Sequence, residues 1–175
     1  LQEASVIGRS FWVTLLHQIT ELKEQLNSSI DRLESLDLIR YHTSEPDIEY
    51  IFKHALTQEV AYNGLLKKQR RKIHQQVALA IEVLFADRLS EFYEALGFHF
   101  SRGESVQKAT DYLVKSGEKS LKFYALKESH QFFSQAYDLI CRLEPRGPAE
   151  REILIGILNK WASVFYFTGD VNGLM

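Results

Sequence analysis

Apolar residues recur at steps of three or four along most of the chain, the spacing that places them on one face of a helix. Before Asp37 this pattern predicts two helices. Ser10 can cap the first, a short helix that begins at Phe11. Its apolar face consists of Phe11, Leu15 and Leu16. The second follows Thr20, and its stripe consists of Leu22, Leu26, Ile30, Leu33 and Leu36.

The pattern changes between residues 38 and 52. Two short runs rich in β-branched and aromatic residues, at 38–41 and 48–52, flank a polar, turn-forming segment at 42–47 that contains Pro46. Such an arrangement predicts a β-hairpin. Two helices followed by a hairpin have the order of elements in a winged helix, so we expect a winged-helix domain over residues 1–65.

Helical periodicity returns after the hairpin. Leu56, Val60 and Leu65 predict a helix that bends or breaks at Gly64. A long helix is predicted over residues 67–86, with its inward positions at Ile73, Val77, Ala80, Ile81 and Leu84. Another begins at Asp87 or Ser90 and ends at Arg102–Gly103, and it carries Phe92, Leu96 and Phe100.

The last third of the chain predicts three more helices. The stripe of the first consists of Val106, Ala109, Leu113, Gly117 and Leu121. The stripe of the second consists of Ser129, Phe132, Phe133, Ala136 and Leu139. The third helix covers residues 153–167, and the segment 168–170 terminates it. A loop at 144–148 separates the second from the third. Small residues beside clustered aromatic ones suit close helix packing, so we expect antiparallel hairpins of the tetratricopeptide type over residues 66–175. The expected fold class is therefore mainly α.

Composition excludes several classes of protein. The 175 residues are 45% hydrophobic and 25% charged, as in soluble globular chains. A net charge of -2 with a pI near 6.3 opposes a dedicated nucleic-acid binder. Cys141 is the single cysteine, which excludes an internal disulfide and a cysteine-rich zinc site. No apolar run is long enough to span a bilayer, so we predict no membrane partner. The single cysteine suits a reducing cytosol, so we predict a cytoplasmic location.

Several sequence blocks occur in a characteristic order. They are residues 4–11, Leu33-x-x-Leu36-x-Leu38-Ile39, residues 50–62 (Tyr-Ile-Phe-Lys-His-Ala-Leu-Thr-Gln-Glu-Val-Ala-Tyr), Leu65-Leu66, Arg70-Arg71 and His74. In this order they resemble the region after the ATPase core in signal-transducing ATPases with numerous domains, the STAND class, of the type fused to class III adenylate/guanylate cyclase domains. Residues 109–117 and 124–136 are similar to the helical-repeat arm of that group.

The resemblance implies that the chain is a segment of a longer protein, truncated at its C-terminal end. It implies that ATP or ADP with Mg²⁺ binds in a domain upstream of Leu1. Any cyclase domain would also lie upstream. The chain contains no Gly-x-x-x-x-Gly-Lys-Ser/Thr loop, so we expect it to hold no cofactor itself. No cluster of residues predicts a metal site or a catalytic residue, and we expect no enzyme activity from this segment.

The resemblance also singles out three residues. A histidine at the junction between the second wing strand and the next helix faces the ADP phosphate in related proteins, and His54 occupies that junction here. A helix N-terminus suits an anion, and imidazole adds a hydrogen-bond donor. Related proteins often have Met-His-Asp there, whereas this chain has Lys53-His54-Ala55. Arg71 and His74 match the family pattern, and the resemblance implies that they contact the ATPase core.

The basic run at residues 67–72 has a simpler interpretation. The long helix needs Ile73 and Val77 inward, which leaves most of these charges in water. Contact with phosphates, nucleic acid or acidic lipid is the alternative.

The leading hypothesis is a regulatory segment that packs on its own upstream ATPase domain and carries an unidentified protein partner on its helical arm. The alternative is a DNA-binding winged-helix regulator. Acidic residues outnumber basic ones in its candidate recognition helix, which opposes contact with phosphates. The wing loop adds Glu45 and Asp47 to this negative charge.

Overall fold

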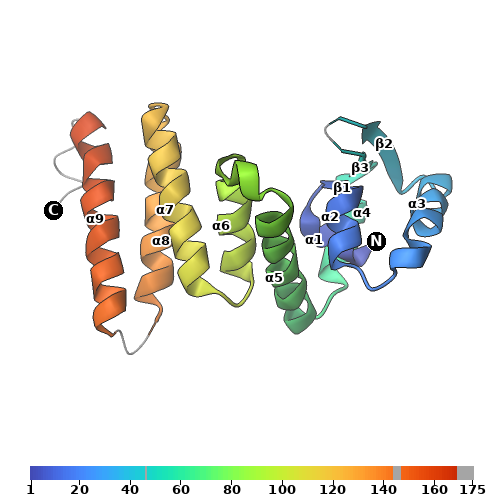
Figure 1. Cartoon of the computed structure of the whole chain (residues 1–175), viewed down its shortest axis with the longest axis horizontal. Helices are drawn as coiled ribbons and strands as arrows, with labels where there is room; N and C mark the ends of the chain where they lie inside the picture. Colours follow the sequence, from blue (N-terminus) through green and yellow to red (C-terminus); the bar gives the residue numbers. More distant parts are fainter. Residues whose placement is uncertain (46, 144–146, 169–175) are drawn as a thin grey trace. The chain divides into compact units, whose positions relative to one another are not determined.

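The computed structural model describes residues 1–45, 47–143 and 147–168. The chain divides into two compact units, Leu1–Asp87 and Arg88–Met175, which are described separately below. The fold is mainly helical with one small antiparallel sheet, as the hydrophobic pattern predicts (Figure 1). Within the described residues, no helix combines the length and the apolar character that crossing a bilayer requires.

The first unit begins with helices and strands in alternation. Its elements are α1 (Gln2–Ile7), β1 (Ser10–Trp12), α2 (Val13–Ile19), the 3₁₀ turn η1 (Lys23–Gln25), α3 (Leu26–Ser35), β2 (Ile39–Thr43), β3 (Glu49–Phe52), α4 (Ala55–Asn63) and α5 (Lys67–Leu84). The predicted hairpin is confirmed, because β2 pairs with β3 in antiparallel register. The predicted break at Gly64 is confirmed too, since α4 ends there.

The first predicted helix forms and buries Leu15 and Leu16, but its predicted start at Phe11 is wrong. Residues 10–12 form β1, which pairs antiparallel with β3 and gives the sheet order β1-β3-β2. Phe11 lies opposite Tyr50, and its ring meets that of Phe52 edge-on at 5.7 Å. These contacts link residues forty positions apart, so local periodicity gives no sign of them. Ser10 consequently caps nothing, and α2 begins at Val13.

The stripe predicted between Leu22 and Leu36 is only partly buried. Leu26 and Ile30 belong to the core, whereas Leu22 and Leu36 are exposed. The α-helix begins only at Leu26, after η1, and it ends at Ser35, before Leu36. The helical repeat therefore extends over fewer residues than the apolar pattern suggests.

The long helix α5 packs against α1 and α2 in the same unit. Val77, Ala78 and Ile81 are fully buried on this face, as the sequence predicts for Val77 and Ile81. The compact unit therefore runs past residue 65, where the sequence places its domain boundary, and includes α5. The turn η2 (Ala86–Glu91) follows.

The second unit consists of α6 (Tyr93–Arg102), α7 (Val106–Lys122), α8 (Leu126–Cys141) and α9 (Pro148–Thr168). Consecutive helices pack on one another. Part of the predicted 144–148 loop, and part of the stop at 168–170, lie outside the described residues. Pro148 begins α9, where its missing N–H costs nothing. One cluster of its core consists of Leu113, Ala136, Ile140 and Ile157.

Gly117 sets the distance between α7 and α8. A Cβ atom built on it would lie 2.9 Å from two ring carbons of the fully buried Phe133. The Gly117 carbonyl accepts a hydrogen bond from the buried Ser129 hydroxyl at 2.8 Å. The absence of a side chain at residue 117 therefore admits the Phe133 ring and brings the two backbones close together.

We expect Gly117→Ala to lower the free energy of unfolding by about 1–2 kcal/mol, because overpacking against Phe133 exceeds the gain in helix propensity. Gly156→Ala is the matched control, since nothing lies within 4 Å of a Cβ built there. That variant should gain up to about 1 kcal/mol. Urea unfolding followed by far-ultraviolet circular dichroism gives both values. Equal stability of the two variants would contradict this packing account.

Candidate functional site

His54 lies between β3 and α4, at the position that precedes the first helical residue. Its backbone is extended, with φ -120° and ψ 135°, and its side chain is exposed. No side chain caps the first turn of α4. The strand therefore delivers an imidazole to a helix N-terminus that has no side-chain cap, an arrangement that suits an anion.

Two apolar side chains are exposed beside this histidine. Leu56 and Val60 lie one turn apart on α4, and their exposed fractions are 67% and 63%. The helix that they predict forms, but both side chains are exposed because α4 packs on α1 through its other side. There Ala61 is buried, and the Gln58 amide donates to the Ser5 carbonyl at 2.7 Å. We call His54, Leu56 and Val60 the α4 surface.

Lys53 precedes the α4 surface but its charge is already compensated. Its ammonium group forms an ion pair with the Asp37 carboxylate. Asp37 has a positive φ of 61°, and the Lys53 amide donates to the Leu38 carbonyl at 3.1 Å. These contacts fasten the end of β3 to the start of β2. His54 is left as the polar side chain that faces outward at this junction.

His74, in contrast, lies inside the first unit. Its exposed fraction is 1%, and its Nε2 lies 3.0 Å from the Tyr62 hydroxyl, with which it shares a hydrogen bond. The Arg70 guanidinium stacks over the same tyrosine ring, 4.9 Å from its centroid. The Arg70 Nε is buried without a hydrogen-bond partner among the described residues. These three residues fasten α4 to α5.

The three residues predicted from the resemblance thus have different surroundings. His54 and Arg71 are exposed, and no described contact joins either of them to the other or to His74. Direct contact between His74 and another domain would require the ring to leave its buried position. The interaction roles of Arg71 and His74 stay predictions.

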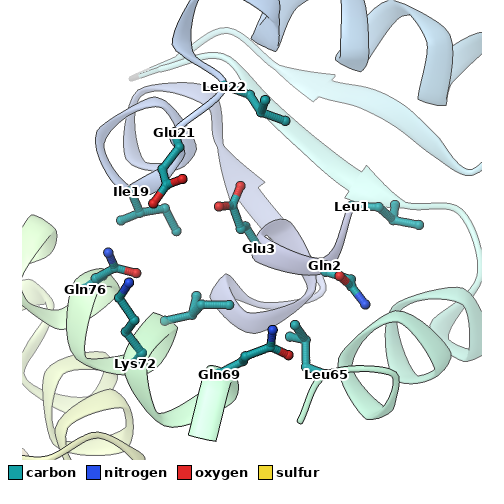
Figure 2. Close-up of a pocket in the computed structure, with 11 residues that line it drawn as sticks. Leu1, Gln2, Glu3, Ile19, Glu21, Leu22, Leu65, Gln69, Lys72 and Gln76 are labelled. Carbon is teal, nitrogen blue, oxygen red and sulfur yellow. The ribbon is translucent and has the colours of Figure 1, made fainter.

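A cavity of about 390 Å³ adjoins α1, the end of α2 and the first half of α5. Figure 2 shows the Glu3 and Glu21 side chains directed into this space, with Lys72 and Gln76 on its α5 side. No ion pair joins Lys72 to either carboxylate. Charged groups with no nucleophile beside them favour binding over catalysis. Among the described residues, no group of three or more His, Cys, Asp or Glu residues could hold a metal ion.

Periodicity missed the α4 surface and this cavity for the same reason. Apolar spacing shows that a helix has an apolar face, but it does not show which neighbouring element that face contacts. The exposure of Leu56 and Val60 follows only from the way α4 packs on α1, which the sequence pattern does not show.

We expect Tyr62→Phe to lower the free energy of unfolding by about 1–2 kcal/mol, because it removes the hydroxyl that pairs with the buried His74. Tyr166→Phe serves as the control, since Tyr166 is exposed on α9 and losing its hydroxyl should cost almost nothing. Thermal unfolding followed by circular dichroism distinguishes the two. If the two variants melt alike, the Tyr62–His74 bond does not stabilise the fold.

No protein-family model matches the chain, and no solved structure matches it. A relative in Rhizobium meliloti (strain 1021), an uncharacterized protein, is 30% identical over 108 residues. The match covers 62% of this chain and 10% of the relative. The chain thus spans about a tenth of the length of a curated protein to which it is similar.

Proposed function

We propose that the chain is a non-catalytic regulatory segment of a larger signal-transducing ATPase, and that it docks on the nucleotide-binding core through the α4 surface. The observation that carries this proposal is the exposed His54 at an uncapped helix N-terminus, beside the exposed Leu56 and Val60. Water-exposed apolar side chains next to an anion-seeking group suit a protein interface that lies over a bound phosphate.

The first unit supports a winged-helix assignment by its order of elements. A helix, a strand, two helices and two strands follow one another from α1 to β3, and β1 joins the hairpin through β3. In such a domain the hairpin is the wing. The helix α4 then begins where the wing ends, so movement of the wing would move His54 as well.

The second unit supports a tetratricopeptide-like arm. Its helices pack each on the next, and Gly97 and Gly117 allow close approach to Leu113 and Phe133. We propose that this arm binds a protein partner. Exposed apolar residues on α9 are consistent with such a contact: Ile155, Leu158, Tyr166 and Phe167.

In the proposed mechanism, ADP and Mg²⁺ bind in the upstream domain, and His54 contacts the phosphate of the bound nucleotide. The α4 surface then covers apolar residues of that domain and favours a closed, inactive state. A signal at the helical arm that breaks this contact shifts the population to the open state. No residue of this chain takes part in covalent chemistry.

DNA binding receives no support from the charges near the hairpin. The exposed side chains of α3 include Asp31 and Glu34, and Asp47 follows the hairpin turn. These carboxylates would meet the phosphates of a duplex entered by α3. The electrostatics of this face therefore favour a protein partner.

The proposal is tested by calorimetric titration of the chain with the upstream nucleotide-binding domain, first with ADP and then with an ATP analogue. We expect tighter binding with ADP. His54→Ala should weaken the ADP-dependent binding by about ten-fold, the loss of one charge-assisted contact. His17→Ala, another exposed histidine in the same unit, is the control and should change nothing. An affinity that is the same with ADP and the ATP analogue, and unchanged in His54→Ala, would contradict the proposal.

A further inference from the structure

The N-terminal half of α5 has an unusual concentration of positive charge. Half of the lysine and arginine residues of the first unit lie between residues 67 and 72, and acidic residues predominate over the rest of that unit. Arg70 turns toward Tyr62. The other four are exposed and form what we call the basic face: Lys67, Lys68, Arg71 and Lys72.

Helix geometry places these four side chains together. Lys67 and Arg71 are four residues apart, as are Lys68 and Lys72, so each pair lies one turn apart on the same side of α5. None of the four side chains forms an ion pair or hydrogen bond with a described residue. The basic face is therefore a set of uncompensated charges at short separation.

This clustering of positive charge lowers the stability of the unit when no partner is bound. Like charges one turn apart repel each other, and cations in the first turn of a helix oppose its dipole. The first turn of α5 contains no acidic residue that would relieve either effect. A surface that only needed to be soluble would gain stability from mixed charges, so the basic face suits a partner that supplies the missing negative charge.

The surroundings of the basic face limit the size of that partner. Lys72 lines the same cavity as Glu3 and Glu21 (Figure 2). A nucleic-acid duplex or an anionic membrane is negative over its whole surface and would meet these carboxylates as well. A narrow polypeptide segment could cover the four cations without reaching the Glu3 and Glu21 carboxylates. The exposed Leu66, directly before α5, adds an apolar contact of the kind that protein segments use.

We propose that the basic face is a docking site for an acidic segment of a protein partner, with several Asp or Glu side chains close together in sequence. The site uses α5 and the Leu66 that precedes it, and no residue of the α4 surface, so it does not depend on the proposed contact between the α4 surface and a nucleotide-binding core.

The test uses the whole 175-residue chain and a fluorescein-labelled oligoglutamate peptide, with fluorescence anisotropy at low and physiological salt. Replacing the four residues of the basic face by Gln should weaken binding by at least about ten-fold, since several charge contacts are lost together. The same variant should melt a few degrees higher, because the repulsion within α5 is gone. That shift also shows that the variant is folded.

The control variant replaces four exposed basic residues of the same unit by Gln: Arg9, Lys23, Arg32 and Arg40. It loses the same total charge, and its binding should stay within about two-fold of the unmodified chain, since remote surface charges are screened. Equal losses in both variants would overturn the proposal, because the attraction would then be general. Tighter binding to duplex RNA or to phosphatidylserine vesicles, at the same salt, would overturn it in favour of those surfaces.

Discussion

The first unit depends on the burial of one face of α5 against α1 and α2. Val77, Ala78 and Ile81 are buried on this helix, so the rotation of the long helix about its own axis is fixed. The rotation determines which side chains at its start meet the protein and which meet water. His74 consequently reaches Tyr62 on α4, while the basic face is left outside. The surfaces proposed as docking sites thus follow from a hydrophobic contact some residues away.

Much of this fold could be predicted from spacing alone. The hairpin, the break at Gly64 and the four helices from α5 to α8 follow from local periodicity and from glycine. The strand β1 could not be predicted, because its three residues gain their stability by pairing with β3 far along the chain. The turn η1 was missed because apolar spacing continues through it, whereas only Leu26 and Ile30 meet the core.

The candidate site could be predicted in part, and for an instructive reason. The strand-to-helix junction placed His54 correctly at the start of α4, since caps and breaks are local features. The direction of Leu56 and Val60 is a tertiary property, which the apolar spacing of α4 does not determine. His74 is buried and pairs with Tyr62 inside the unit, and the interaction role that the resemblance implies for it stays a prediction.

The α4 surface and the basic face differ in chemistry but are mechanically connected. Between them the chain passes through Gly64 and the buried Leu65, and the Tyr62–His74 bond closes the corner on its inner side. Arg70 belongs to the same corner, because its guanidinium covers the Tyr62 ring while its neighbours in sequence face outward. A segment bound along the basic face would restrain the first turns of α5, and through Arg70 and Tyr62 it would also restrain α4. Because the connection is a short set of packed side chains, disrupting the Tyr62–His74 pair should separate the two surfaces functionally while leaving each one intact.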